Sequence, residues 1–198
     1  MAYNIKLLNG HTIGKKKYFF DSNIWLIIVK PKMVPTDREQ RYIDFVENFK
    51  TSTQNPKIVI PALMLSEIIN RYLHDVGMPK FKAKNPLIAE LPKFYKEHYR
   101  QSDQFKIDYE LICDDIKSYN KYYELIPDNL GIDFKTKHLL SNPPKGLDFN
   151  DHYYYLMAKK RGYTIVTDDA DFFVEDVDVL TYNNKLYKRG TDSVIPKI

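Results

Sequence analysis

The sequence predicts an α/β fold with three layers, in which helices cover both faces of a central, mainly parallel sheet. Short runs of β-branched and aromatic residues at 18–20, 57–60 and 163–166 are typical of buried strands, and segments with helical spacing of apolar residues alternate with them. This alternation favours a parallel sheet, because parallel strands need a crossover connection that packs on a face. We therefore expect a single domain that spans residues 1–198.

The composition is typical of a soluble protein with a sizeable core, since 43% of the residues are hydrophobic and 28% are charged. A single cysteine, Cys113, excludes an intramolecular disulfide and a zinc site built from several cysteines. The apolar run at 24–29 is far shorter than the roughly 18 residues of a membrane span, and the N-terminus lacks an apolar core of signal-peptide length. We expect a cytoplasmic protein with no membrane contact.

The net charge of +4 is modest, but gathering several acids into one site would leave the rest of the surface more basic. A basic surface favours a polyanionic partner. The chain also has 16 Tyr and 11 Phe, which suit both cores and base stacking. The three consecutive tyrosines at 153–155 therefore either contact bases or pack in the core, and helix geometry sends at least one of them to the core.

The N-terminal part begins with a strand at 18–20 that ends in Asp21. The apolar run that follows begins a buried helix or continues buried structure. Thr36 and Glu39 have the spacing of a capping box, which predicts a helix over 37–50.

The second strand, at 57–60, leads into a second helix. Pro61 is suited to the start of that helix, which we predict over 62–74. Glu67 lies on it, so an acid follows this strand as well.

A helical insertion of about residues 84–126 separates the two halves of the domain. A loop predicted over 75–83 leads into it, and Pro92 must kink or restart its first helix. Apolar residues between 109 and 123 form a cleaner helical stripe. The stretch 128–146 is expected to be mostly loop.

A helix over 148–161 and the strand at 163–166 form the best-defined unit of the sequence. Asp148 is the expected N-cap of the helix, and Gly162 follows its last turn, where glycine commonly ends a helix. The strand then delivers two consecutive acids at its carboxyl end.

The last predicted element is a strand at 178–182. Asn183 and Asn184 follow it and resemble a tight turn, so 185–188 is expected to form the second strand of a hairpin.

Acids therefore accompany three strands of the predicted sheet. Asp21 follows the first, Glu67 lies in the helix after the second, and Asp168 and Asp169 follow the third, whose preceding helix carries Asp151. Because ligands of α/β proteins bind outside the carboxyl ends of parallel strands, we expect these carboxylates to meet at one edge of the sheet.

Four carboxylates brought within a few ångströms of one another repel, unless some take up protons or a cation neutralises them. A metal ion is the natural occupant of such a site. Carboxylate oxygens without cysteine or a histidine pair point to Mg²⁺ or Mn²⁺ rather than zinc.

The residues around these acids resemble the PIN-domain family of metal-dependent ribonucleases, which includes the VapC-type toxins. The matching stretches are FFDSN at 19–23, PALMLSEI at 61–68, and Asp151 with Gly162 eleven residues later. The most specific stretch is GYTIVTDDADF at 162–172, which is similar to the family's sequence of glycine, apolar strand, threonine, acid and aromatic residue.

This resemblance implies a PIN-like α/β/α sandwich and a metal-dependent endoribonuclease. In such an enzyme one or two Mg²⁺ or Mn²⁺ ions activate the water that attacks an RNA phosphodiester, and the products carry 5′-phosphate and 3′-hydroxyl ends. The residues implied as metal ligands and catalytic groups are Asp21, Glu67, Asp151 and Asp169.

Several neighbours are implied in supporting roles. Asn23 and Thr167 would orient a water molecule or a ligand carboxylate. Asp168 and Asp171 are close enough in sequence to keep the assignment of the fourth acid open, and Asp148 lies one helical turn from Asp151, so that it too is a candidate ligand.

The resemblance also implies partners. A VapC-type toxin would have a small antitoxin protein that blocks its site, and it would often form a homodimer. The insertion at 84–126 departs from a compact toxin, so it is expected to have a role of its own.

Two alternatives from other classes remain. A haloacid-dehalogenase-like phosphohydrolase also starts with a strand that ends in Asp, but it needs a second Asp where this chain has Asn23. The other alternative is a PIN fold that binds RNA or acts as a scaffold without cleavage, for which loss of some of the four acids would be expected. Taken singly, each acid also suits a turn or a solvated helix position.

Overall fold

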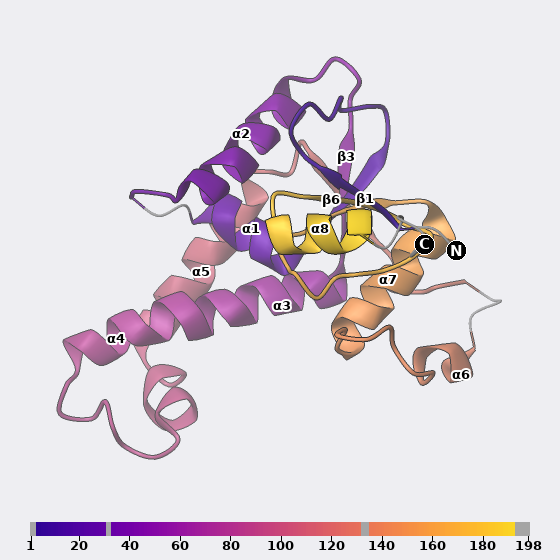
Figure 1. Cartoon of the computed structure of the whole chain (residues 1–198). Coiled ribbons are helices and arrows are strands. Elements are labelled where there is room, and N and C mark those ends of the chain that lie inside the picture. The colour runs from indigo at the N-terminus through magenta and orange to yellow at the C-terminus, as the bar shows by residue number, and fades with distance from the viewer. Residues whose placement is uncertain (1–2, 31–32, 132–134, 193–198) are drawn as a thin grey trace.

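The computed structural model describes residues 3–30, 33–131 and 135–192. A parallel sheet with helices on both faces forms its centre (Figure 1). The six strands lie in the order β1-β6-β5-β2-β3-β4, and their bounds are β1 Asn4–Leu7, β2 Lys17–Phe20, β3 Lys57–Pro61, β4 Tyr123–Ile126, β5 Thr164–Val166 and β6 Asp178–Thr181. All pairings between the described strands are parallel. The expected three-layer α/β fold is confirmed.

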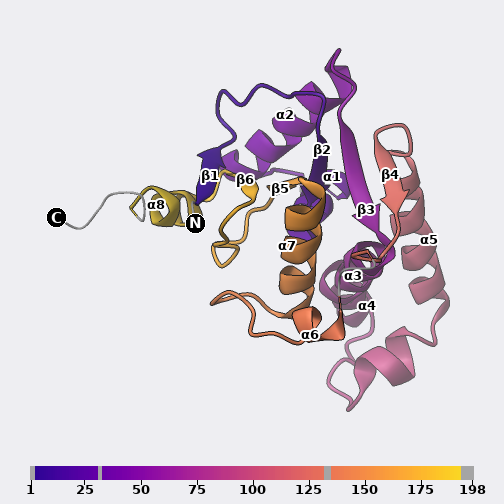
Figure 2. The same ribbon diagram turned by 90° about the vertical axis from the view of Figure 1, so that its right-hand side faces the viewer.

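The α-helices follow the chain between and after the strands. Their bounds are α1 Ser22–Val29, α2 Asp37–Thr51, α3 Ala62–Tyr72, α4 Met78–Lys84, α5 Asp103–Lys117, α6 Thr136–Leu139, α7 Phe149–Arg161 and α8 Asn184–Asp192. Figure 2 shows α7 in front of the sheet and α2 behind it. The helices expected at 37–50 and 148–161 are confirmed, with the predicted capping box at Thr36 and the predicted N-cap at Asp148.

The side chains of β2 alternate between the two faces of the sheet, as the pleat requires. Tyr18 and Phe20 both pack on Phe49 of α2, with ring centroids 5.3 and 5.7 Å away. Phe19 points to the other face, where its ring centroid lies 4.9 Å from that of Tyr154 on α7. All three β2 rings are completely buried, so the central strand of the sheet is also the centre of the core.

The register of the sheet brings the ends of β2 and β5 level with each other. Phe20 pairs with Val166, and the next residue, Asp21, donates its backbone N–H to the Val166 carbonyl oxygen at 3.0 Å. Residues that follow these two strands therefore lie side by side at the carboxyl edge of the sheet.

Two of the expected non-helical segments are helical. The loop expected at 75–83 is wrong, because α3 continues through a π-helix at Leu73–Gly77 into α4. Pro79 is the second residue of α4, directly after the π-helix, where its fixed φ of about −65° suits a helix. The hairpin strand expected at 185–188 is also wrong, since this segment lies in α8.

The start of α8 explains the second error. The Asn183 side-chain oxygen accepts hydrogen bonds from the N–H groups of Lys185, at 3.0 Å, and Leu186, at 3.4 Å. Asparagine favours both turns and helix N-caps, and here it caps a helix.

Both edge strands were missed by the sequence analysis. The four-residue strand β1 pairs with β6, and β4 pairs with β3 at the other edge. β4 occupies the last residues of the insertion expected at 84–126, which otherwise contains α5 and a π-helix at Tyr95–Tyr99. Of the loop expected at 128–146, residues 132–134 lie outside the described residues, and α6 forms a short helix.

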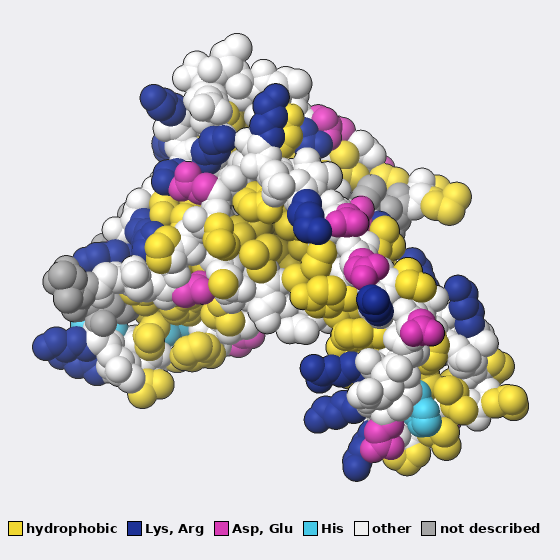
Figure 3. Space-filling view, turned by 180° about the vertical axis from the view of Figure 1, so that it is seen from behind, with side chains coloured by type: hydrophobic (Ala, Val, Ile, Leu, Met, Phe, Trp, Pro, Cys, Tyr) yellow, Lys and Arg dark blue, Asp and Glu magenta, His cyan; other side chains and the backbone are white. Residues whose placement is uncertain are grey.

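A helical arm, formed by residues 78–102, projects from the rest of the molecule (Figure 1). Figure 3 shows Lys and Arg side chains along one edge of this arm. Within the described part of the chain, no helix is both long and apolar enough to cross a membrane.

Candidate functional site

Asp21 lies at the carboxyl end of β2 and is 4% exposed. Its carboxylate caps α1, because Oδ1 accepts a hydrogen bond from the Ser22 N–H at 2.6 Å. Its other oxygen, Oδ2, accepts from the Thr167 hydroxyl at 2.7 Å and from the Asn23 side-chain amide at 2.6 Å. The two residues expected to orient a carboxylate, Asn23 and Thr167, thus contact the same oxygen of Asp21.

Glu67 reaches the same region from α3. Its Oε1 accepts from the Ser22 hydroxyl at 2.5 Å, and its Oε2 accepts from the Tyr154 hydroxyl at 3.0 Å and the Asn150 amide at 3.3 Å. Arg71, one helical turn after Glu67, donates to the Ser22 hydroxyl at 2.6 Å. Elements α1, α3 and α7 therefore meet at the Glu67 carboxylate.

Asp151 lies on α7 between the two residues that bind Glu67. Its backbone N–H is capped by the Asp148 carboxylate at 2.9 Å, so Asp148 serves as the N-cap of the helix. Among the described residues, none donates a hydrogen bond to the Asp151 carboxylate. This side chain therefore has its oxygens available for a ligand.

The loop after β5 carries the remaining candidate acids. Asp169 donates its N–H to the Thr167 hydroxyl at 2.9 Å, which ties it to the residue that binds Asp21. Asp171 donates its N–H to Asp169 Oδ1 at 2.8 Å, while its own carboxylate lies 3.8 Å from Arg189 and is 68% exposed. Asp171 therefore faces away from the other acids.

Asp168 faces α2 rather than Asp21. Its carboxylate lies 3.2 Å from the Arg38 guanidinium and accepts from the Tyr42 hydroxyl at 3.0 Å. The Asn183 amide holds the Asp168 backbone carbonyl at 2.6 Å. The structure thus gives this acid a cationic partner of its own, on the side of the loop next to α2.

The pKa values of the acids show that they influence one another. Burial raises the pKa of Asp21 from 3.8 to about 6, and the charges of Glu67 and Asp169 add to this effect. Burial also raises the pKa of Asp151 from 3.8 to about 7, with further contributions from Asp21, Asp148 and Asp169. The structure therefore brings Asp21, Glu67, Asp151 and Asp169 into one electrostatically coupled cluster, hereafter the acid cluster.

The acid cluster offers only carboxylate oxygens, the donors that Mg²⁺ and Mn²⁺ prefer. Among the described residues, no three His, Cys, Asp or Glu side chains already stand in an arrangement that holds a metal ion. Both oxygens of Asp21 and of Glu67 accept hydrogen bonds from neighbouring groups, which fix the orientation of these carboxylates. The donor chemistry fits a hard divalent cation.

The sequence analysis missed several groups that hold the acid cluster. Ser22 and Arg71 support Glu67, and Tyr154 binds it from α7. Tyr153, Tyr154 and Tyr155 are all buried, so they pack in the core and do not present their faces to bases. Arg71 reaches Glu67 only through Ser22, a contact between α3 and α1 for which the sequence holds no signal.

We predict that the metal-free protein loses stability as pH rises from about 4 to about 7. The folded-state pKa values of Asp21 and Asp151 lie above those of the unfolded chain, so the folded protein binds more protons throughout this window. The expected loss is about 4–5 kcal/mol, of which the buried Asp21 contributes about 3 at 1.36 kcal/mol per unit of pKa shift and Asp151 about 1–2 after discounting for its partial exposure. Urea unfolding in EDTA from pH 4.5 to 8 measures it.

The Asp151→Asn variant isolates this effect, because its unfolding free energy should depend less on pH across the same window. Equal pH dependence in the variant and the wild type would contradict the assignment to Asp151.

Tyr42 connects the loop after β5 to the end of β6. Its buried hydroxyl accepts from the Tyr182 N–H at 2.8 Å and lies 3.0 Å from both the Thr167 carbonyl oxygen and the Asp168 carboxylate. Replacing it in Tyr42→Phe leaves these groups unpaired, so we predict a loss of about 1–3 kcal/mol in unfolding free energy. Chemical denaturation measures this loss.

The control for this variant is Tyr109→Phe, which removes the hydroxyl of a tyrosine that is 45% exposed. We expect it to change stability by less than about 0.5 kcal/mol. Equal effects of the two variants would show that the Tyr42 hydroxyl does not connect these strand ends.

Comparison with known proteins gives similarities to solved structures only. No model of a known protein family matches the chain, and no curated protein matches it. VapBC2 from Rickettsia felis, solved bound to a DNA fragment from their promoter, is similar at 14% identity over 84% of this chain and 98% of that chain, with a TM-score of 0.47. PAE2754 from Pyrobaculum aerophilum is similar at 14% identity over 94% and 97%, with a TM-score of 0.42.

Proposed function

We propose that this chain is a PIN-type endoribonuclease that hydrolyses RNA phosphodiester bonds with Mg²⁺ or Mn²⁺ at the acid cluster. The observation that carries the proposal is the convergence of Asp21, Glu67, Asp151 and Asp169 at the carboxyl edge of a parallel sheet. The raised pKa values of Asp21 and Asp151 destabilise the fold at neutral pH when no cation is bound. A cation-binding role accounts for their presence.

In this proposal the acids bind the cation and the neighbouring polar residues orient the acids. Asp21, Glu67, Asp151 and Asp169 would hold the cation, directly or through water. When bound, such a cation neutralises charge on the phosphate oxygens and lowers the pKa of a bound water. Thr167 and Asn23 orient the Asp21 carboxylate through the hydrogen bonds described above, and Ser22 and Tyr154 orient that of Glu67.

The distribution of basic residues supports a polyanionic substrate. Residues 78–106, which contain the helical arm, have seven Lys and Arg against three Asp and Glu. Figure 3 shows part of this charge along one edge of the arm. We propose that the helical arm contributes electrostatic attraction for RNA, which salt would weaken.

A toxin role extends this proposal, with a small antitoxin protein that covers the acid cluster. It rests on the resemblance of the 19–23, 61–68 and 162–172 motifs to the VapC-type sequences. Co-purification of a small protein expressed from the same transcript, lost on denaturation, would test it.

The test of the nuclease is cleavage of a mixed panel of structured and single-stranded RNAs with Mg²⁺, with Mn²⁺ and with EDTA. We expect cleavage that needs the metal and that disappears in Asp21→Asn and Asp151→Asn. Glu110→Gln, which removes an exposed charge on α5, should cleave like the wild type. Cation binding without cleavage would favour a phosphohydrolase of small substrates, and absence of cation binding would favour a scaffold.

A further inference from the structure

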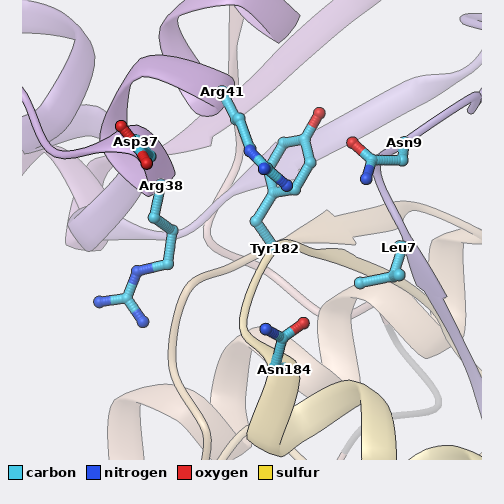
Figure 4. Close-up of a pocket in the computed structure, with 7 residues that line it drawn as sticks. All are labelled: Leu7, Asn9, Asp37, Arg38, Arg41, Tyr182 and Asn184. Carbon is cyan, nitrogen blue, oxygen red and sulfur yellow. The ribbon is translucent and has the colours of Figure 1, made fainter.

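A small cavity of about 220 Å³ lies beside the acid cluster, at the carboxyl ends of β1 and β6 (Figure 4). Three segments surround it: the end of β1, the first turns of α2 and the residues that follow β6. The lining residues used below are Asn9, Asp37, Arg38, Arg41, Tyr182 and Asn184.

The chemistry of this cavity suits an anion. Two guanidinium groups, of Arg38 and Arg41, and two side-chain amides, of Asn9 and Asn184, line it together with the Asp37 carboxylate, and Arg38 is already paired with Asp168. Arginine presents several N–H donors in a planar fork that matches phosphate oxygens. Among the described residues Arg41 forms no ion pair, so its guanidinium and the two amides are the donors that favour a phosphate group.

In the described part of the chain, Arg41 contacts an aromatic ring and forms no ion pair with an acid. Its guanidinium carbon lies 5.7 Å from the centroid of the Tyr182 ring, and Figure 4 shows the guanidinium over that ring. A cation over an aromatic face gains a modest attraction and keeps its N–H groups in the plane free to donate. Arg41 is exposed, so a ligand from solution can reach it.

The cavity is connected to the acid cluster through the ends of β5 and β6. Arg38 pairs with Asp168, whose predecessor Thr167 donates to Asp21. The sheet order places β6 two strands from β2, which corresponds to roughly 10 Å at the usual strand spacing. These two strand ends are thus close enough for one polynucleotide to reach both with phosphates one or two nucleotides apart.

We propose that this cavity is a subsite for a backbone phosphate of the bound RNA other than the one that is cleaved. The inference rests on the proposed function, because it assigns the cavity to the same substrate. Its volume is below the roughly 300–1,000 Å³ of pockets for drug-sized ligands, so it accommodates a phosphate with part of its sugar and not a whole cofactor.

The test compares two variants that each lose one positive charge. Arg41→Ala removes the arginine of the cavity, whereas Lys121→Ala removes an exposed lysine just before β4, at the opposite edge of the sheet. Binding of a fluorescent single-stranded 12-nucleotide RNA is measured by anisotropy in EDTA at several salt concentrations. We expect Arg41→Ala to bind about tenfold more weakly, with a salt slope smaller by about 0.7, and Lys121→Ala to match the wild type.

Two further measurements locate the phosphate. Arg41→Lys keeps the charge but not the planar fork, so its affinity should fall between those of the wild type and Arg41→Ala. In an RNA that the protein cleaves, one neutral methylphosphonate linkage placed one or two nucleotides from the cut should slow cleavage by the wild type but not by Arg41→Ala.

The outcomes separate this proposal from the proposed function. Binding that depends on Arg41 without any cleavage would support the subsite and overturn the nuclease. Metal-dependent cleavage with equal binding by Arg41→Ala and Lys121→Ala would overturn the subsite alone. Adenosine monophosphate that binds as tightly as the RNA, in a manner dependent on Arg41, would show that the cavity takes a free nucleotide and would also overturn it.

Discussion

The Asp151→Asn variant should be more stable than the wild type at pH 8 without divalent cations, and it should lose RNA cleavage by at least about 100-fold. The loss follows because even residues that only support metal ligands typically contribute 10–100-fold to metal affinity or activity, and Asp151 is proposed as a ligand itself. The gain follows because amide replacement removes a charge that its surroundings disfavour.

The size of the stability gain can be bounded. A rise in the pKa of Asp151 from 3.8 to about 7 corresponds to about 4 kcal/mol if taken at full value. Solvent screens a partly exposed group, so we expect an increase of about 1–2 kcal/mol in unfolding free energy. Among the described residues no hydrogen bond to the Asp151 carboxylate is lost in Asp151→Asn. The difference in unfolding free energy from the wild type therefore reports the removed charge.

The measurement is thermal and urea unfolding in EDTA and in Mg²⁺, alongside cleavage assays. Mg²⁺ should stabilise the wild type more than Asp151→Asn, since a ligand that binds only the folded state stabilises it. Glu110→Gln serves as the control and should change neither the unfolding free energy nor the rate of RNA cleavage. If Asp151→Asn lost both activity and stability, Asp151 would have a structural role. The proposal that a cation neutralises its disfavoured charge would then lose its support.

The Gly77→Ala variant should be destabilised by about 2–3 kcal/mol. Gly77 is buried at the end of the π-helix that joins α3 to α4. A Cβ atom there would lie 2.0 Å from the Tyr99 hydroxyl oxygen and 2.8 Å from an Asp108 carboxylate oxygen. These two groups are themselves joined by a hydrogen bond of 2.7 Å, so the added methyl group must separate them or shift the helix.

A double-mutant cycle shows whether contact between the added Cβ and the Tyr99 hydroxyl causes the loss of stability in Gly77→Ala. Tyr99→Phe removes the oxygen nearest to the added Cβ, so Gly77→Ala should cost at least about 1 kcal/mol less in the Tyr99→Phe background. Gly14→Ala is the matched control, because a Cβ at Gly14 would meet no atom within 4 Å and its φ is not in the left-handed region. Additive effects of Gly77→Ala and Tyr99→Phe would show that the hydroxyl is not the obstacle.

The sequence predicts the layers of this fold because its buried strands are short, apolar and followed by helices with clear caps. The central strands β2, β3 and β5 have this character. The strand β1 does not, since it alternates polar and apolar residues over only four positions and depends on β6 for its hydrogen bonds. Edge strands are therefore the part of the sheet that is hardest to predict from the sequence.

Tertiary packing also explains why residues 75–83, predicted as a loop, are helical. Gly77 and Pro79 are ordinary loop signals. Here Gly77 is required by close packing against Tyr99 and Asp108, and Pro79 occupies a first turn that tolerates it. Packing between distant segments decided the structure of residues whose local preference was ambiguous.

The acids that form the cluster could be predicted because Asp21 and Asp169 follow strands, and Glu67 and Asp151 lie on helices next to strands of the same sheet. The way in which they are held could not. Glu67 is bound by Tyr154 and Ser22, which come from other elements, and the pairing of Arg38 with Asp168 depends on how α2 crosses the sheet. Such contacts arise from tertiary packing, which spacing along one chain does not show.

The order of the strands also determines when activity can arise during synthesis. Asp21 is made early, but the hydroxyl that orients it belongs to Thr167, and the strand next to β2 on that side is β5. A nascent chain that ends before α7 holds Asp21 and Glu67 but neither Asp151 nor Asp169. Contacts between residues so far apart in sequence also form slowly. Under the proposed function, most of this chain has to be synthesised before its acid cluster is complete.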